Sequence, residues 1–326
     1  MLTAAAQTLL RQLADGRFHS GTALAARLGV SRAAVWKRVR QLRAAGVSIA
    51  AVPGRGYRLE PPLELLDPAA IDRALRDLAA APPAALICHT CLPSTNAWLL
   101  DQASRLPNGS VCLAEAQTVG RGRLGRRWVS PFGCHLYLSL LWRFDDGTAV
   151  TGLSLAVGVA VRQALTRIGA EGVRLKWPND LLWQGHKLGG ILIEAVSEPQ
   201  GPCTVVIGVG VNGTMPAAAA RQIDQPWVDL RTLLGRPPPR NRLAAGVIAE
   251  LLALLRRYQD DGAATWLARW REHNCVLGRR VNVHQGGEVY TATAVDVTAD
   301  GALVLVDAAG RRRQVNAGDV KLRVED

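Results

Sequence analysis

The segment VGRGRLGRRW, residues 119–128, places three glycines and four arginines within ten residues. Its glycines satisfy the G-x-G-x-x-G spacing of a dinucleotide-binding turn, which opens a helix. Pro131 and Gly133 stand where that helix would continue, and this excludes a Rossmann turn. A Walker A loop is excluded as well, because two arginines follow Gly125 in place of Lys and Ser or Thr. The segment therefore indicates a phosphate-binding loop of a third kind.

The residues downstream of this loop predict the architecture of its domain. We expect a long apolar helix at 151–169, followed by strand-like stretches at 173–183, 187–196 and 204–212. Consecutive strands with short turns favour a mixed or antiparallel sheet with helices on one face. The central part of the chain is therefore expected to be α+β instead of doubly wound.

Two lysines in these strands suggest a ligand site. Lys176 interrupts a strand that the turn PND ends, and Lys187 enters a strand that continues with Gly189 and Gly190. Glycine weakens a strand and often stands where a ligand approaches the backbone. Each lysine by itself is better explained as a solvated side chain, because lysine is mostly exposed. Together with the arginine-rich loop, they predict cations converging on an anion such as a nucleotide phosphate.

The N-terminal part shows the spacing of a helix-turn-helix. In SGTALAARLGVSRAAVWKRVRQLRAAG, residues 20–46, Ser20 caps one helix that Gly29 ends, and Ser31 caps a second that stops at Gly46. A basic hairpin follows at 47–60, as in a winged helix. The outer face of the second helix suits a DNA major groove, although a solvated charged helix is the alternative. The residues predicted to contact DNA are Ser31, Arg32, Ala33, Trp36, Lys37 and Arg40.

Composition and charge point to an anionic partner. The chain has a formal net charge of +12, and residues 1–60 carry ten Lys or Arg against two acidic residues, or +8 of that total. No apolar run is long enough to span a bilayer, so we expect a cytoplasmic protein with no membrane contact. The six cysteines are expected to be buried thiols. Neither they nor the six histidines are spaced as metal ligands, so no metal site is predicted.

The chain is expected to form three domains. Prolines at 60–68 mark a linker, and from residue 276 short strands alternate with turns at QGGE, TADG and AAGR. We predict a winged helix-turn-helix DNA-binding domain at 1–62, a catalytic domain at 63–274 and an SH3-like β-barrel at 275–326.

Three segments resemble the signature segments of biotin–protein ligases: STN at 94–96, GRGRLGRRWVSPFG at 120–133 and KWPNDLLWQGHKLGGILIE at 176–194. With its winged helix, the chain is similar to the bifunctional kind, which is both biotin operon repressor and biotin–[acetyl-CoA-carboxylase] ligase. The resemblance implies a class II synthetase-like catalytic fold that makes biotinyl-5′-AMP and pyrophosphate from biotin and ATP with Mg²⁺. The biotinyl group then passes to a lysine of the biotin carboxyl carrier protein of acetyl-CoA carboxylase. Biotinyl-AMP would also act as corepressor, favouring a homodimer that binds operator DNA.

The resemblance also assigns site residues by position. It places biotin against Ser94, Thr95, Asn96, Gln117, Arg121, Gly122, Arg123 and Lys187. It places the nucleotide against Trp128, Lys176, Asn179, Asp180 and Asn212, with Asp180 and Asn212 at the magnesium or nucleotide end. Its catalytic residues are Arg121, Arg123, Lys176 and Lys187, whose cations would bind the carboxylate and the phosphates. A buried core aromatic is the alternative for Trp128.

The sequence departs from the family pattern at two positions, and two other functions stay open. Leu124 stands where the loop often has a third arginine, and Trp36 stands where the DNA-facing helix often has a smaller polar residue. The second departure leaves the operator sequence open. The alternatives are a ligand-sensing transcription factor without catalysis, against which the lysines and the arginine loop argue, and a lipoate-type ligase.

Overall fold

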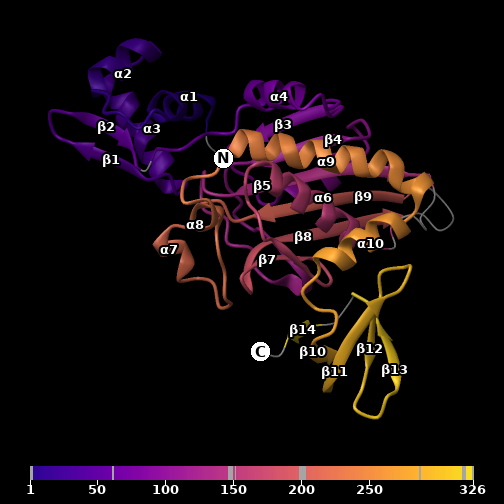
Figure 1. The fold of residues 1–326 in the computed structure, drawn as a ribbon. Helices are drawn as coiled ribbons and strands as arrows, with labels where there is room; N and C mark the ends of the chain where they lie inside the picture. The colour runs from indigo at the N-terminus through magenta and orange to yellow at the C-terminus, as the bar shows by residue number, and fades with distance from the viewer. Residues whose placement is uncertain are drawn as a thin grey trace.

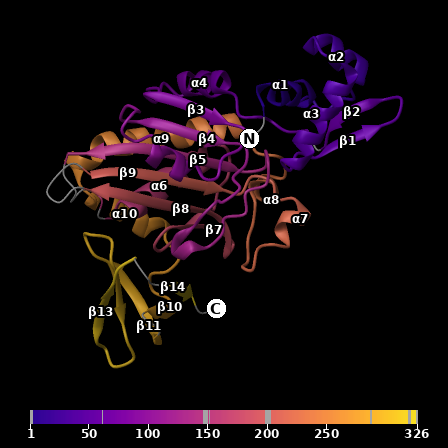
Figure 2. The ribbon, with the colours of Figure 1, turned by 180° about the vertical axis from the view of Figure 1, so that it is seen from behind.

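A computed structural model describes residues 3–60, 62–145, 150, 152–197, 203–285, 288–317 and 321–324. Three parts follow one another along the chain: a helical N-terminal part, a central sheet flanked by helices, and a C-terminal sheet (Figure 1). The view from behind shows the N-terminal and C-terminal parts at separate ends of the central sheet (Figure 2).

The N-terminal part is the predicted winged helix-turn-helix. Its helices are α1 (Ala4–Leu13), α2 (Gly21–Leu28) and α3 (Arg32–Ala44), and its wing pairs β1 (Ile49–Val52) with β2 (Gly56–Leu59). The Ser20 and Ser31 hydroxyls accept hydrogen bonds from the Ala23 and Ala34 amides, so both predicted N-caps are confirmed. The apolar residues predicted to face inward include Leu24, Val35, Val39 and Leu42, which are buried.

The central part is a seven-stranded mixed sheet in the order β3-β4-β5-β9-β8-β7-β6. Only β3 and β4 pair in parallel among these neighbours, which confirms the predicted mixed sheet. The strands are β3 (Ala85–His89), β4 (Ser110–Ala114), β5 (Leu136–Phe144), β6 (Arg174–Lys176), β7 (Asp180–Trp183), β8 (His186–Ser197) and β9 (Cys203–Val211). The strand-like stretch at 173–183 is the hairpin β6–β7, and the predicted turn PND lies between its two strands. Pro178 lacks the amide hydrogen that a continuous ladder needs.

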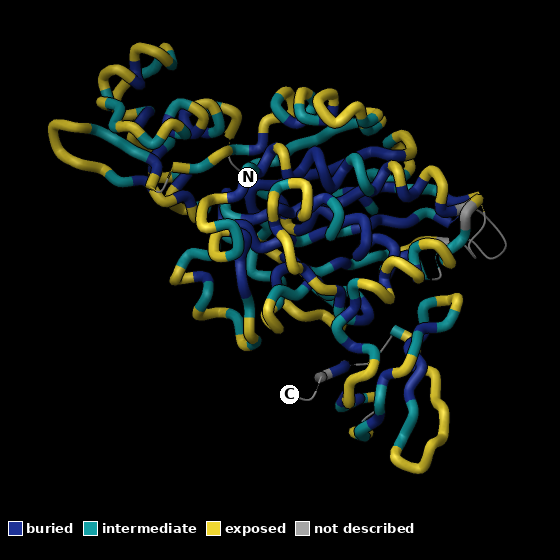
Figure 3. Tube along the Cα trace, in the orientation of Figure 1, coloured by how far each residue is buried: buried dark blue, intermediate teal, exposed yellow. Residues whose placement is uncertain are grey.

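Helices cover both faces of this sheet, which corrects the expectation of helices on one face. Helices α4 (Pro68–Asp77), α6 (Leu153–Arg167), α9 (Arg240–Asp261) and α10 (Ala264–His273) share the large hydrophobic core on one side. Helix α5 (Thr95–Asp101) packs on the other side, where Cys112, Leu141 and Val206 form a smaller cluster with Leu99. Successive residues of a strand point to opposite faces, so the central strands are buried on both sides (Figure 3).

The C-terminal part is an antiparallel five-stranded sheet in the order β13-β12-β11-β10-β14. Its strands are β10 (Arg280–Gln285), β11 (Glu288–Val297), β12 (Leu303–Val306), β13 (Arg312–Val315) and β14 (Lys321–Val324). It is anchored to the central part by Trp177, a buried residue of the β6–β7 turn. The Trp177 indole donates a hydrogen bond to the Gly301 carbonyl oxygen at 3.0 Å.

The linker before α4 is held by buried polar contacts. The Arg240 guanidinium lies 2.8 Å from the Glu115 carboxylate, and both side chains are less than a tenth exposed. Arg240 also donates to the Glu64 carbonyl oxygen at 2.6 Å, while the Leu66 amide donates to Glu115 Oε1 at 2.5 Å. These contacts tie the linker to the residues that precede the arginine-rich loop.

Candidate functional site

A polar cluster lies at the N-terminus of α5, against the middle of the sheet. Ser94 caps the helix, and Thr95 and Asn96 in its first turn are almost completely buried. Gln117 Oε1 accepts a hydrogen bond from the Thr95 amide at 2.8 Å. The structure therefore brings together four residues predicted to bind biotin: Ser94, Thr95, Asn96 and Gln117. Gln117 follows Asn96 by 21 residues along the chain.

A glycine makes room for this cluster. A Cβ atom on Gly208 of β9 would lie 2.4 Å from Asn96 Oδ1 and 2.9 Å from Asn96 Cγ. The amide group of Asn96 thus rests directly on the strand backbone. It donates from Nδ2 to the Leu192 carbonyl oxygen at 3.2 Å and to the Glu194 carboxylate at 2.8 Å.

The arginine-rich loop folds back on itself beside the cluster. The Gly122 amide donates to the Arg126 carbonyl oxygen at 2.7 Å, and the Trp128 amide donates to that of Gly120 at 2.9 Å. A short 3₁₀ helix at Arg123–Gly125 forms the tip. Leu124 in this tip is more than half exposed, with a φ of 55°, so it takes no part in a core.

Two arginines of the loop reach back to strand residues. The Arg121 guanidinium lies 3.3 Å from Glu194 Oε1 of β8. Arg123 donates to the Asn179 side-chain oxygen at 3.3 Å, which lies in the turn between β6 and β7. The loop therefore joins the predicted biotin residues to the segment that carries Lys176 and Asp180.

Two lysines and a carboxylate form the second half of the site. Lys187 Nζ lies 2.7 Å from Asp180 Oδ1, and Asp180 pairs with Lys176 across the β6–β7 hairpin. Burial lowers the pKa of the Lys176 ammonium, and the Asp180 carboxylate opposes this shift. Two of the four predicted catalytic cations, Lys176 and Lys187, thus lie beside Asp180.

Trp128 lies flat on a floor made of glycine. A Cβ atom on Gly210 would lie 2.8 Å from the Trp128 ring atom Cε2, and a Cβ on Gly190 would lie 3.6 Å from the same ring system. Lys187 Nζ stands 5.7 Å from the ring centroid, within the range of a cation–π contact. The indole N–H is buried without a hydrogen-bond partner. Trp128 therefore stands in the site beside the cations, and its predicted contact with adenine stays a prediction.

Two predicted nucleotide residues have their amide groups engaged with the backbone. Asn179 donates from Nδ2 to the Ile191 carbonyl oxygen at 2.7 Å. Asn212 donates to the Val228 carbonyl oxygen at 3.0 Å and to that of Lys187 at 3.3 Å. These contacts hold the strands around Lys187, and the side-chain oxygen of Asn212 remains the group for the predicted nucleotide contact.

Four residues of the site were not predicted from the sequence: Ser139, Glu194, Gly208 and Gly210. The glycines have a detectable signal, because they alternate within a strand as G-x-G and so lie on one face. Ser139 and Glu194 are single polar residues within apolar strands, a weaker signal. Only the arrangement of β5, β8 and β9 under α5 shows that they belong to the site.

The arrangement can bind a ligand with two different ends. The buried hydroxyl and amide groups near α5 suit a small polar head group. The cations of the loop and of β6–β8 suit a carboxylate and phosphates, and they lie where negative charge would grow when these two anions react. A loop between both ends can shield a reactive intermediate from water.

A separate face of the molecule carries the predicted DNA contacts. The predicted residues are all exposed, on α3 or at its N-cap: Ser31, Arg32, Ala33, Trp36, Lys37 and Arg40. The Arg40 guanidinium stacks 4.8 Å from the Trp36 ring centroid, and Trp36 is half exposed. The helix therefore presents an exposed basic face, as an α-helix that enters a major groove does.

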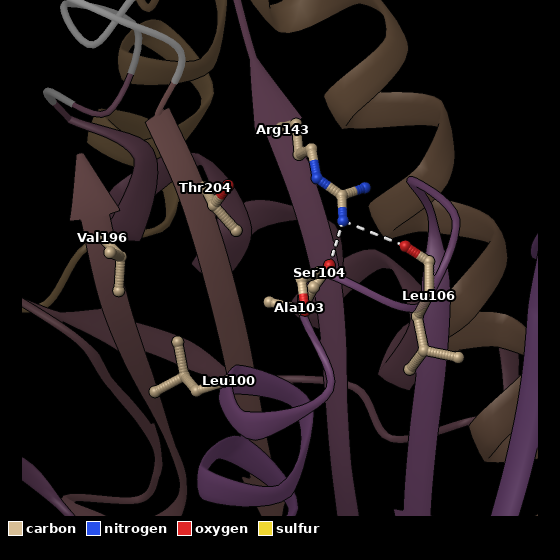
Figure 4. A pocket seen from close by; sticks show the side chains of 7 residues that line it. All are labelled: Leu100, Ala103, Ser104, Leu106, Arg143, Val196 and Thr204. Atoms are coloured by element: carbon tan, nitrogen blue, oxygen red, sulfur yellow. Dashed lines mark hydrogen bonds between the residues drawn. The ribbon is translucent and has the colours of Figure 1, made fainter. Parts of the chain in front are cut away.

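Another hollow lies beyond the C-terminal end of α5 and is distinct from this site. Leu100, Ala103, Leu106, Val196 and Thr204 line it with Ser104 and Arg143. Arg143 is held by hydrogen bonds to the carbonyl oxygens of Ala103 and Leu106 (Figure 4). None of its lining residues is among those predicted to bind biotin or nucleotide.

Two further features concern the part of the chain that the structure describes. No helix there has both the length and the apolar character needed to cross a membrane. The same residues bring no three His, Cys, Asp or Glu side chains together in a way that suits a metal ion.

Comparisons with known proteins match three successive segments of the chain to family models. Family models match residues 88–212 as the biotin/lipoate A/B protein ligase family, residues 6–58 as an HTH domain and residues 276–323 as the biotin protein ligase C terminal domain. The chain is 40% identical over 97% of both lengths to the bifunctional ligase/repressor BirA of Salmonella typhimurium. It is 36% identical to the biotin–[acetyl-CoA-carboxylase] ligase of Mycobacterium tuberculosis, over 81% of this chain and 97% of that one.

A solved structure shows the same fold. The biotin protein ligase of Aquifex aeolicus in complex with biotin and ATP superposes with a TM-score of 0.64 at 25% identity. The match covers 74% of this chain and 99% of that one.

Proposed function

Because this chain belongs to the biotin/lipoate A/B protein ligase family, we propose that it joins biotin to ATP and transfers the biotinyl group to a carrier protein. In the first step the biotin carboxylate attacks the α-phosphorus of ATP, forming biotinyl-5′-AMP and releasing pyrophosphate. In the second step a lysine amine of the carrier attacks the acyl carbon and AMP leaves. The carrier that we propose is the biotin carboxyl carrier protein of acetyl-CoA carboxylase. The name of the M. tuberculosis relative includes acetyl-CoA carboxylase as the enzyme that receives biotin.

The observation that carries this proposal is the meeting of a buried polar cluster with several cations. Thr95, Asn96 and Gln117 form the polar end, and Lys187 Nζ stands over Trp128 at the other end. Both substrates are anions, so bringing them together costs electrostatic repulsion that neighbouring cations remove. Cations held in place before the reaction also stabilise the charge that develops on the transferred phosphate.

Each part of the site then has a role. The α5 cluster would hold the ureido ring of biotin, while Arg121 and Arg123 bring the loop onto the carboxylate. Lys187 would contact the carboxylate and the α-phosphate, and Lys176 the remaining phosphates of the MgATP substrate. Trp128 would stack against adenine.

The first experiment is pyrophosphate release by the purified protein with ATP, Mg²⁺ and biotin, and with lipoate in a parallel reaction. We expect release that depends on biotin and not on lipoate. Release with lipoate alone would show a lipoate-type ligase. Biotin binding without any release would identify a ligand sensor that has lost the reaction.

We also propose that the protein represses transcription, with biotinyl-AMP as corepressor and the dimer as the form that binds operator DNA. The exposed basic face of α3, with Arg32, Lys37 and Arg40, supports this function. A ligand that favours the dimer strengthens DNA binding by the same coupling free energy. Such a repressor acts where ATP and the chromosome are, and we therefore propose the cytoplasm as its location.

DNA binding can be tested by its salt dependence. A face that neutralises about five phosphates predicts a slope near −4.5 for log Kobs against log salt concentration. Addition of biotinyl-AMP should strengthen binding and shift the protein to a dimer in analytical ultracentrifugation. Binding that ignores the adenylate would contradict the corepressor role.

A further inference from the structure

The carboxylate of Glu194 connects the two ends of the predicted biotin site. It lies on β8 with its side chain 27% exposed. One oxygen, Oε2, accepts a hydrogen bond from Asn96 Nδ2 at 2.8 Å, and the other lies 3.3 Å from the Arg121 guanidinium. Glu194 thus contacts both the polar cluster and the loop.

A chain of hydrogen bonds runs from Glu194 into the polar cluster. Asn96 Oδ1 lies 2.6 Å from the Ser139 hydroxyl oxygen, and that oxygen lies 2.7 Å from Thr95 Oγ1. Asn96, Ser139 and Thr95 are each at most 6% exposed, so water cannot easily replace any of these bonds. The direction of each bond is therefore decided within the protein.

Glu194 decides that direction because a carboxylate only accepts hydrogen bonds. It turns the NH₂ group of Asn96 toward itself and toward the Leu192 carbonyl oxygen, which also only accepts. The amide oxygen of Asn96 then faces Ser139 and takes the single hydroxyl hydrogen of that residue. Because that hydrogen is used on Asn96, the 2.7 Å contact between the Ser139 and Thr95 hydroxyls can be a hydrogen bond only with Thr95 as the donor.

Thr95 Oγ1 is left with lone pairs only for any further partner. Its other near neighbour, Gln117 Oε1, is also an acceptor: it accepts from the Thr95 amide at 2.8 Å and lies 3.2 Å from Thr95 Oγ1, so either neighbour takes the hydroxyl hydrogen of Thr95. We infer that Glu194 is a positioning residue: through Asn96 and Ser139 it presents Thr95 Oγ1 as an acceptor for a ring N–H group of the ligand. This inference rests on the proposed function, in which the ligand is biotin.

The same arrangement selects between ligands. The ureido ring of biotin carries two N–H groups, whereas the dithiolane ring of lipoate has none. A buried acceptor with no donor opposite it loses a hydrogen bond that it makes with water in the free protein, so a ring without N–H binds less well. Glu194 therefore contributes to the choice of a ligand that it does not touch.

The test compares Glu194→Gln with the wild type, using two ligands in calorimetric titrations. One is biotin, and the other is its cyclic carbonate analogue, in which oxygen replaces both ring N–H groups. A Gln side chain can donate as well as accept, so the hydrogen-bond chain loses its single direction. We expect the preference for biotin over the analogue to fall about tenfold, the size of one hydrogen bond, with little change for the analogue.

Two further variants separate positioning from general damage. Glu250→Gln makes the same change in the Arg167–Glu250 ion pair between α6 and α9, at a distance of 2.7 Å, and should leave both affinities unchanged. Ser139→Ala interrupts the chain without touching Glu194 and should reproduce the loss of preference. It also serves as the test if Glu194→Gln fails to fold. In a protein that already carries Thr95→Val, Glu194→Gln should have no further effect on the ratio of the affinities for biotin and for the analogue.

An equal weakening of biotin and analogue in Glu194→Gln would show a structural role only and would overturn the inference. An unchanged ratio in the folded variant would overturn it as well. A wild-type protein that binds no biotin would overturn the proposed function, and the inference with it, so the two failures can be told apart.

Discussion

Replacing Lys187 with Met removes the cation that the proposed function places against both the biotin carboxylate and the α-phosphate. Lys187 Nζ lies 2.7 Å from Asp180 Oδ1 and 5.7 Å from the Trp128 ring centroid. Met keeps an unbranched side chain of similar length, so the change acts mainly through charge. We expect kcat/KM for biotin-dependent pyrophosphate release to fall about 10²–10³-fold, the loss that follows removal of one donor aimed at developing negative charge.

Stability should change far less than activity. The Lys187 and Asp180 side chains are 17% and 22% exposed, so water reaches both members of the pair. Loss of a partly solvated ion pair costs about 1 kcal/mol or less. The backbone of Lys187 keeps its hydrogen bonds with Pro226 and Val228, so β8 begins at the same place. We therefore expect a folded protein with nearly unchanged circular dichroism.

The assay is initial-rate pyrophosphate release at several biotin concentrations, with thermal unfolding measured on the same samples. Arg167→Met is the matched control, because it breaks an ion pair of the same length, 2.7 Å, with Glu250 on the face of the sheet that α6 and α9 cover. That variant should keep wild-type kinetics. A folded Lys187→Met protein with kcat/KM within about threefold of the wild type would refute the role of Lys187 in transition-state stabilisation.

Three further predictions concern the floor, the linker and a buried histidine. In Gly210→Ala the new Cβ would lie 2.8 Å from a Trp128 ring atom, so the indole must shift. Steady-state kinetics should show a KM for ATP about tenfold above the wild-type value, and a KM for biotin within about twofold of the wild-type value. In Glu115→Ala the Arg240 guanidinium stays buried without its carboxylate, and urea unfolding should show a loss of about 3–5 kcal/mol; a loss below 1 kcal/mol would contradict the buried pair. Burial lowers the pKa of His135 to about 4, so the unfolded chain binds a proton at this residue before the folded protein does as the pH falls below 6.5. The free energy of unfolding should therefore drop by up to about 3 kcal/mol between pH 6.5 and 4. A His135→Asn variant should show a smaller drop.

The winged helix is the part that could be predicted most completely from the sequence. Ser20 and Ser31 are N-caps in the structure, and Gly29 ends α2 in the left-handed conformation. These signals act over three or four residues, so they need no knowledge of the rest of the fold. The exposure of Trp36 and Arg40 follows from the same helical periodicity.

The central sheet could be predicted only in part. Its mixed character follows from the order of strands and short turns, but the position of α5 on the second face does not. Strands buried on both sides read as continuous apolar runs, and such runs do not show which helix covers which face. The turn PND was predicted to end the strand that carries Lys176, but the segment after the turn, β7, was not predicted as a separate strand.

The candidate site, like the sheet, could be predicted from the sequence only in part. The sequence alone determined which residue types carry the proposed chemistry. The arginines of the loop, Lys176 and Lys187 can be identified as candidates because they are cations close to glycines in the sequence or beside a turn. Only the tertiary structure decided that Glu194 on β8 meets Asn96 on α5, 98 residues away along the chain, and that Ser139 joins them. The direction of a hydrogen-bond chain depends on which buried acceptor stands at its end. That is a property of three strands and a helix packed together, and it leaves no local pattern in the sequence.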